Sequence, residues 1–351
     1  MPGNAPAVDL DTLVAALKAA GEPTRLRILA LLREGDLTVK DLTTILGQSQ
    51  PRISRHLKLL VEADLVRRYP EGAWAYYRLA ETGRNGGFAA GLVGSLDRGE
   101  PLLRRDLERL DAVKRAHAEA AAAYFATNAG SWDELRSLHV SEASVERAMR
   151  EAIGERPFNA MLDIGTGTGR ILELFGDLYQ HGIGIDQSQP MLAVARANLD
   201  RTGDGRGQPA GAPSPSVQVR HGDVYAIPLT PGSFDLVTIH QVLHFLDDPA
   251  RAVREAARML RPGGRLLITD FAPHGLEFLR SDHAHRRLGF DHATVEDWIR
   301  AAGLEPVSTR DLVAADETAD TLTVTIWLAR DPRIEIAGER ADGARTAVRT
   351  A

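Results

Sequence analysis

The amino-acid sequence predicts an α/β protein with an N-terminal winged helix-turn-helix domain and a C-terminal Rossmann-like domain. Two patterns support this fold class. In about the first 80 residues, short stretches of helical periodicity are followed by a pair of strand-like segments. From Phe158 onward, apolar strand segments alternate with helical ones, which is the pattern of a parallel sheet. At 351 residues the chain is long enough for two or three cores.

The composition is typical of a soluble globular protein, with 44% hydrophobic and 26% charged residues. No apolar run approaches the roughly 20 residues that cross a bilayer, and the first ten residues lack the basic and apolar stretches of a secretory signal. We therefore expect a cytoplasmic protein without a membrane partner. The absence of cysteine excludes disulfides, thiolate nucleophiles and thiolate metal sites.

The first helices are predicted from apolar spacing and from the residues at their ends. Residues Leu10 to Leu17 keep helical spacing, and Gly21-Glu-Pro23 ends that helix. A second helix is expected from Thr24 to Gly35. Thr38-Val-Lys-Asp41 has the form of a capping box and predicts a third helix, which Gly47 closes.

A fourth helix and a hairpin complete the predicted winged helix. The helix begins at Ser49 or Gln50 and has Pro51 in its first turn, where a missing N–H costs nothing. Two strands, Arg67–Tyr69 and Trp74–Leu79, are expected on either side of a turn.

A long helix is predicted from Leu102 to Phe125. Its apolar residues Leu103, Leu107 and Leu110 recur at spacings of three and four, as on a helix face that packs against a partner. We assign this face to dimerisation or to packing between domains, and we expect a homodimer.

The second half of the chain predicts strands separated by helices. The expected strands are Ala160–Ile164, His181–Ile185, Val217–His221, Leu236–Ile239, Arg265–Thr269 and Thr321–Ala329. Residues Thr202–Ser216, rich in Gly, Pro, Ala and Ser, are expected to form a flexible loop. The predicted division is 1–98 for the winged helix, 99–150 for a helical linker and lid, 151–332 for the sheet domain and 333–351 for a disordered tail.

The fourth helix carries the residues of a DNA-reading helix. Arg can bond guanine in bidentate fashion and Gln can bond adenine, while further cations meet phosphates. The net charge of −6 argues against an obligate nucleic-acid binder, but the basic character here is local. The alternative is a basic solvated helix face. The candidate DNA-binding residues are Gln50, Arg52, Ser54, Arg55, Lys58, Arg67 and Arg68, and Arg78 is a further candidate for phosphate contact.

Four motifs mark the N-terminal part: Glu22-Pro-Thr-Arg-Leu-Arg-Ile-Leu29, Ser49-Gln-Pro-Arg-Ile-Ser-Arg-His-Leu-Lys58, Leu65-Val66 and Tyr76-Tyr-Arg-Leu79. Through these motifs this part resembles the ArsR-type winged-helix repressors. The resemblance implies homodimers that bind a double-stranded DNA operator, many of which release DNA when a metal binds. The thiol-sensing members carry two cysteines at the places where this chain has Thr38 and Lys40, so we expect no metal site.

A glycine-rich loop follows the first strand of the second half. Gly165, Gly167 and Gly169 allow a sharp turn and the close approach of a ligand to a helix N-terminus. A dinucleotide site would place glycine where this chain has Arg170, so the pattern does not fit NAD. Asp186, at the end of the next strand, can accept both hydroxyls of a ribose.

The second half resembles the class I S-adenosylmethionine-dependent methyltransferases, whose sheet is mostly parallel with an antiparallel last strand. The carriers are Leu162-Asp-Ile-Gly-Thr-Gly-Thr-Gly169, Gly184-Ile-Asp-Gln-Ser188, Gly222-Asp-Val224, Phe234-Asp-Leu-Val237 and Leu260-Arg-Pro-Gly-Gly264. The resemblance implies S-adenosylmethionine or S-adenosylhomocysteine as cofactor. The implied binding residues are Asp163, Gly165, Gly167 and Gly169 for the methionine moiety, Asp186 for the ribose, Asp223 and Val224 for the adenine, and Gln241 near the sulfonium, with Thr166 and Gln187 as further cofactor-binding residues.

Residues after the fourth strand of this half are candidates for catalysis. His240, Gln241 and His244 lie where substrate meets the methyl group, and a histidine there can act as a general base. The alternative is that these histidines line a pocket without chemistry. Two further groups have open interpretations: Tyr124-Phe125 with Trp132-Asp133 as a lid or as domain packing, and Asp282, His283, His285, Asp291 and His292 as a ligand cluster or a polar pocket rim.

The joint arrangement resembles bacterial regulators in which an ArsR-type domain is fused to a methyltransferase domain. Two functions are therefore weighed. The first is a transcriptional repressor whose second domain senses S-adenosylmethionine or S-adenosylhomocysteine. The second is an active methyltransferase of a small molecule whose winged helix provides autoregulation. Arsenite methylation is not expected, because the chain has no cysteine to hold the metalloid.

Overall fold

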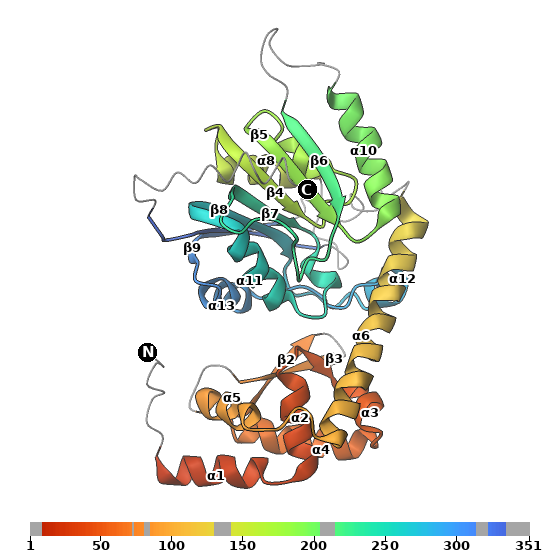
Figure 1. Ribbon diagram of the computed structural model, residues 1–351, viewed down its shortest axis with the longest axis vertical. Coiled ribbons are helices and arrows are strands. Elements are labelled where there is room, and N and C mark those ends of the chain that lie inside the picture. Colours follow the sequence, from red (N-terminus) through yellow and green to blue (C-terminus); the bar gives the residue numbers. More distant parts are fainter. Residues whose placement is uncertain are drawn as a thin grey trace. The chain divides into compact units, whose positions relative to one another are not determined.

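The computed structural model describes residues 9–71, 74–80, 85–129, 142–203, 215–313 and 322–334 (Figure 1). The chain divides into two compact units, Met1–Glu119 and Ala120–Ala351. Three predicted features lie wholly or mostly outside the described residues. They are the lid residues Trp132-Asp133, most of the predicted loop 202–216, and the predicted tail 333–351 apart from its first two residues. No helix in the described ranges is long and apolar enough to span a membrane.

The first unit is a winged helix, as predicted. A three-stranded antiparallel sheet in the order β1-β3-β2 packs with the helices. The elements are α1 (Leu10–Ala20), α2 (Pro23–Leu32), β1 (Leu37–Thr38), α3 (Val39–Leu46), α4 (Gln50–Glu62), β2 (Val66–Glu71), β3 (Trp74–Leu79), α5 (Gly86–Gly94) and α6 (Pro101–Asn128). Strand β1 and helix α5 were not expected, because two residues and a glycine-rich stretch give no clear periodicity.

Local sequence signals define the ends of these helices. The capping box is present: Thr38 Oγ1 accepts a hydrogen bond from the N–H of Asp41, and the Asp41 carboxylate accepts one from the N–H of Thr38. Gly47 ends α3 in the left-handed conformation with φ of 65°. Pro23 and Pro51 lie in the first turns of α2 and α4.

Part of the apolar stripe of helix α6 joins the core of the first unit. Leu110 is buried, and Leu107 and Val113 pack against the core of the first unit. Arg27 of α2 also forms a bidentate ion pair with the buried carboxylate of Asp106, with distances of 2.6 and 2.7 Å. These residues therefore pack within the first unit, which extends well past residue 98, and the assignment of the stripe to dimerisation stays a prediction.

The second unit is built on a seven-stranded sheet in the order β6-β5-β4-β7-β8-β10-β9. Strands β4 to β8 run parallel, and β10 is antiparallel to both of its neighbours, which confirms the predicted sheet. The strands are β4 (Phe158–Ile164), β5 (Tyr179–Asp186), β6 (Ser216–His221), β7 (Phe234–His240), β8 (Leu260–Phe271), β9 (Glu305–Leu312) and β10 (Val324–Arg330). The edge strand β9 was missed because its residues are mostly exposed and polar.

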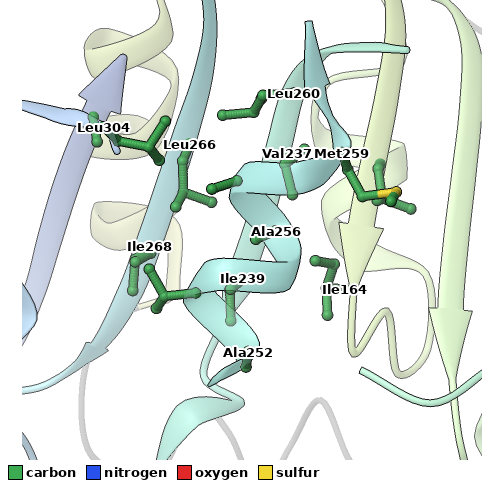
Figure 2. Close-up of a cluster of buried hydrophobic side chains, with 14 of the residues drawn as sticks. Ile164, Val237, Ile239, Ala252, Ala256, Met259, Leu260, Leu266, Ile268 and Leu304 are labelled. Carbon is green, nitrogen blue, oxygen red and sulfur yellow. The ribbon is translucent and has the colours of Figure 1, made fainter. Parts of the chain in front are cut away.

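Helices cover both faces of this sheet. Ala252 and Ala256, one turn apart on α11, let the helix lie close to Ile239 and Val237 of the sheet (Figure 2). A second cluster on the other face includes Met149 of α8. The helices are α8 (Glu142–Ile153), α9 (Arg170–Leu174), α10 (Gln189–Gly203), the 3-10 helix η2 (Leu243–Phe245), α11 (Pro249–Met259), α12 (Phe278–Asp282) and α13 (His292–Ala301).

Candidate cofactor site and DNA-binding helix

The glycine-rich loop joins β4 to α9 at the carboxyl edge of the sheet. Gly165 has φ of 70°, and a Cβ at this position would overlap the side chain of Val242. The N–H groups of Gly165 and Thr166 both donate to the carbonyl of Ile185. Only glycine fits at position 165, because both its backbone angle and the neighbouring side chain exclude a Cβ.

The Thr166 side chain points toward β5 (Tyr179–Asp186). It is buried against Gly184, where a Cβ would lie 2.6 Å from Thr166 Oγ1. Gly167 and Gly169 also adopt positive φ, at 53° and 85°. The Thr166 side chain therefore packs on Gly184, and the backbone of the neighbouring glycines carries no side chain that would keep a ligand away.

Asp186 ends β5 and holds the glycine loop. Its Oδ2 accepts a hydrogen bond from the N–H of Gly167 at 2.9 Å, and its Oδ1 accepts one from the N–H of Ser188 at 2.8 Å. Burial raises the pKa of the Asp186 carboxyl, while these N–H donors act in the opposite direction. Each carboxylate oxygen keeps a second lone pair, which a ribose hydroxyl can use.

Asp223 follows β6, the next strand along the sheet. Its Oδ1 accepts hydrogen bonds from Gln187 Nε2 at 3.1 Å and from the N–H of Tyr225 at 2.9 Å. Val224 is buried beside it. Asp186, Gln187 and Asp223 are thus brought together at the ends of neighbouring parallel strands, as the sequence predicted.

Asp163 lies deeper in the sheet. Its carboxylate is 1% exposed, and its Oδ1 accepts a hydrogen bond of 2.6 Å from Thr238 Oγ1, the paired residue on β7. The switch between β5 and β7 on the two sides of β4 is the position where nucleotide ligands bind in open α/β sheets.

The candidate catalytic residues follow the end of β7. Gln241 has φ of 53°, unusual for a residue with a side chain, and its N–H donates to the carbonyl of Thr269 at 2.7 Å. His240 is buried. His244 is also buried, and its Nδ1 lies 2.7 Å from Asp270 Oδ1. Asp270 was not predicted, although it is an acid near the end of an apolar strand, the residue before the last of β8.

Aromatic rings gather around His244. Its ring centroid lies 4.1 Å from that of His285 and 5.0 Å from that of Phe271. The ring of Phe125 lies 4.8 Å from that of Phe245. Rings from separate segments of the second unit therefore meet at the end of β7 and β8.

The predicted polar cluster does not form as one group. Tyr124 Oη lies 2.8 Å from His283 Nδ1, near the rings described above, whereas His292 pairs with Asp311 at 2.9 Å on α13 and β9. Asp291 caps α13 instead of facing the histidines. In the ranges that the structure describes, no three His, Cys, Asp or Glu side chains could hold a metal ion.

The candidate DNA-binding helix α4 has two different faces. Ile53, Leu57 and Leu60 are buried at helical spacing. The polar candidates of α4 that the sequence singled out are exposed on the remaining surface; they are Gln50, Arg52, Ser54, Arg55 and Lys58. On β2, Arg68 is exposed and Arg67 is half-buried.

Two basic residues near α4 are held within the unit. Arg78 forms an ion pair with the buried carboxylate of Asp36, so the predicted phosphate contact by Arg78 is wrong. His56 Nδ1 lies 3.7 Å from a carboxylate oxygen of Glu22. Burial lowers the pKa of His56, although the charge of Glu22 opposes this shift.

Comparisons with known proteins match both parts of the chain. The family described as "Methyltransferase domain" matches residues 162–268, and the family described as "Bacterial regulatory protein, arsR family" matches residues 22–68. The 27-O-demethylrifamycin SV methyltransferase of Amycolatopsis mediterranei is 33% identical over 52% of this chain and 68% of its own length. The chain belongs to the S-adenosylmethionine-dependent methyltransferases. Its N-terminal domain is of the arsR family.

The similarity to other relatives is partial in length. The arsenical resistance operon repressor of Escherichia coli is 52% identical over 18% of this methyltransferase-family chain and 55% of the repressor. The chain spans 36% of an uncharacterized 37.1 kDa protein in transposon TN4556 of Streptomyces fradiae, at 36% identity over 39% of this chain. A solved putative methyltransferase from Bacillus halodurans is 19% identical, with a TM-score of 0.46 over 54% of this chain and 99% of that one.

The methyltransferase-family membership identifies S-adenosylmethionine or S-adenosylhomocysteine as the cofactor of this chain. The donor set at the strand ends fits such a ligand, because carboxylates such as those of Asp186 and Asp223 can accept hydrogen bonds from hydroxyl and amino groups, and Gly165 and Gly167 carry no side chain that would block a ligand's approach. S-adenosylmethionine supplies an activated methyl group when it is bound.

Proposed function

We propose that this protein is a homodimeric transcriptional repressor in which binding of S-adenosylmethionine or S-adenosylhomocysteine to the methyltransferase domain changes the affinity for DNA. The supporting observation is that one chain carries both an exposed basic face on α4 and a set of carboxylates at the strand ends beside a glycine loop. A ligand can shift DNA binding only through different affinities for the two states of the protein. Because its target is DNA, we place the protein in the cytoplasm.

A homodimer is the expected DNA-binding form. On α1, Leu10 is 75% and Leu17 is 48% exposed, and the two lie two turns apart on one side of the helix. Exposed apolar side chains of this size favour contact with a second surface. Sedimentation of the full chain is expected to give a dimer that weakens in the Leu10→Glu/Leu17→Glu variant, and an unchanged monomer in both proteins would refute this part.

The central experiment titrates the full chain onto its own promoter DNA at one salt concentration. It is done without ligand, with S-adenosylmethionine and with S-adenosylhomocysteine. We expect affinities that differ between the two ligands, since a sensor of methylation state must separate them. Equal affinities in all three arms would refute the sensing function.

Variants of α4 test the DNA-binding face in the same assay. Arg52→Ala is expected to weaken operator binding by about 1–3 kcal/mol and to leave non-specific binding nearly unchanged. Arg104→Ala, an exposed arginine of α6 paired with Glu108, is the matched control. Equal losses on both DNAs for Arg52→Ala would identify a phosphate contact and refute base reading.

A second candidate function is an active small-molecule methyltransferase whose winged helix regulates its own expression. The observation that favours it is the His244–Asp270 pair at the carboxyl edge of the same sheet, the edge that also holds Gly165 and Asp186. One relative, named for 27-O-demethylrifamycin SV, acts on a small molecule. Formation of S-adenosylhomocysteine that depends on a small-molecule acceptor would support this function over pure sensing.

A further inference from the structure

A buried histidine–carboxylate pair lies at the same sheet edge as the cofactor residues. His240 of β7 is paired with Thr269 of the parallel strand β8. His244 lies on the 3-10 helix shortly after β7, and Asp270 directly follows Thr269. The carboxyl ends of parallel strands meet at one edge of a sheet, so this pair lies on the edge that also holds Gly165.

The carboxylate of Asp270 is held in place from two directions. Its Oδ1 lies 2.7 Å from His244 Nδ1 and accepts a hydrogen bond of 2.8 Å from the N–H of Phe271. Asp270 has no exposed surface. A carboxylate accepts hydrogen bonds, so the neutral imidazole carries its proton on Nδ1 and leaves Nε2 as a base.

The surroundings of His244 are flat and aromatic. The ring of His285 is inclined by 31° to that of His244, and the rings of Phe271, Phe245 and Phe125 lie nearby. Aromatic rings pack well against another planar ring in offset or edge-to-face arrangements. The hydrogen-bonded pair of Tyr124 and His283 adds polar groups beside these rings.

We propose that this site takes a planar aromatic acceptor with a hydroxyl group, that His244 is the general base for its methylation, and that Asp270 is a positioning residue. The proposal rests on the cofactor site of the proposed function. A phenolic hydroxyl with a pKa of about 10 is mostly neutral at pH 7, so a base that removes its proton makes the oxygen a stronger nucleophile.

The step is balanced without any further reactant. The hydroxyl proton moves to His244 Nε2, and an oxygen lone pair forms the new C–O bond with the methyl carbon. The C–S bond breaks, its electron pair stays on sulfur, and the sulfonium becomes a neutral thioether. The imidazolium, stabilised by the Asp270 carboxylate, returns its proton to water after product release.

The first test determines which ring nitrogen of His244 carries the proton in the ligand-free full chain. Long-range ¹H–¹⁵N correlation spectra of the histidine rings are recorded for the wild type, and the His244 signals are assigned from their loss in His244→Gln. We expect a protonated Nδ1 and a bare Nε2, with a change of that pattern in Asp270→Asn. An Nε2–H tautomer, or a spectrum that Asp270→Asn leaves unaltered, would overturn the proposal.

The second test measures methyl transfer from labelled S-adenosylmethionine to phenol, catechol and 8-hydroxyquinoline. We expect transfer to the hydroxyl of at least one probe, with kcat lowered about 10²–10⁴-fold in His244→Gln and the affinity for S-adenosylhomocysteine changed little. His292→Gln removes a histidine from an exposed pair with Asp311 and is the matched control. Transfer to none of the probes by the wild type, or equal transfer by His244→Gln, counts against the proposal.

Calorimetry with S-adenosylhomocysteine tests the cofactor site separately from the assignment of His244 as the base. If the wild type binds no S-adenosylhomocysteine, the proposed function itself fails. If the wild type and His244→Gln bind it equally while the tautomer or the transfer result is contrary, the cofactor site stands and only the assignment of base and acceptor fails. Thermal melting of each variant shows whether it is folded, and the wild-type spectrum decides the proposal even if Asp270→Asn does not fold.

Discussion

Replacing Asp186 by Asn tests the cofactor site at its central residue. The substitution keeps the size of the side chain and removes its charge. In the native protein, the Asp186 carboxylate accepts hydrogen bonds from the N–H groups of Gly167 and Ser188. An amide has one oxygen, so its NH₂ group faces one of these two donors and the glycine loop loses one of its supports.

The expected loss of affinity follows from the hydrogen bonds that Asp186 can make to a ribose. A hydroxyl that donates to a carboxylate contributes about 1.5–3 kcal/mol, and the amide of Asn keeps only one of the two acceptor oxygens, so the loss is at least about 1.5–3 kcal/mol. That energy corresponds to roughly a tenfold to hundredfold increase in the Kd for S-adenosylhomocysteine. The disturbed loop adds to this loss, and Asp186→Ala is expected to lose more because it supports neither N–H group.

Isothermal calorimetry with S-adenosylhomocysteine measures the effect. Asp297→Asn, an exposed carboxylate of α13 beside Arg300, is the matched control and should bind as the wild type does. Thermal melting confirms that each variant is folded. A Kd for Asp186→Asn within threefold of the wild type would refute the assignment of Asp186 to the ribose.

The same residue predicts how cofactor affinity depends on pH. Burial raises the pKa of the Asp186 carboxyl above its ordinary value of 3.8. The carboxylate is the form that accepts from the ribose, so affinity falls as pH falls through this raised pKa. The folded, ligand-free protein binds this proton more tightly than the unfolded chain, so the contribution of Asp186 to stability is largest at low pH and is lost as pH rises. Both dependences should be absent in Asp186→Asn.

Three further predictions test other parts of the structure. Gly165→Ala is expected to weaken S-adenosylhomocysteine binding at least tenfold in calorimetry, because the added Cβ overlaps Val242 and the backbone φ is positive; unchanged binding would refute this packing. Asp106→Ala leaves Arg27 largely buried without its partner and is expected to destabilise the first unit by about 3–5 kcal/mol in urea unfolding, whereas a loss below about 1 kcal/mol would show that the pair is dispensable. Burial lowers the pKa of His56, so the first unit should lose stability as pH falls below 6.5 and His56→Gln should lose less; melting temperatures from pH 7 to pH 5 that fall equally in both proteins would contradict this.

Much of the fold can be predicted from short segments of the sequence. The capping box of Thr38 and Asp41 forms as expected, since its partners are three residues apart. Gly165 turns the chain after a buried strand, and Asp186 ends the next one. Such signals are readable because a strand, its turn and the following helix involve only neighbouring residues. They were sufficient to predict the fold of both parts of the chain and the positions of Gly165 and Asp186 at the ends of their strands.

The partners of several polar side chains are far away in the chain, so no local sequence pattern predicts them. Arg78 has the positive charge that a phosphate contact requires, but folding brings its side chain to Asp36. The buried carboxylate of Asp36 needs a partner, and Arg78 provides it. The histidines after residue 282 are close in sequence, yet His283 meets Tyr124 and His292 meets Asp311, because α12 and α13 belong to different parts of the sheet domain.

The sequence by itself thus determined the two folds, the ends of most helices and the order of the candidate cofactor residues along the strands. The tertiary structure alone decided that part of the stripe on α6 packs into the first unit and that Asp270 lies 2.7 Å from His244. The physical reason is that helix caps and glycine turns are stabilised within a few residues. The role of an apolar stripe or of a titratable side chain depends on the residues that contact it in the folded protein, and these residues can be far away in the sequence.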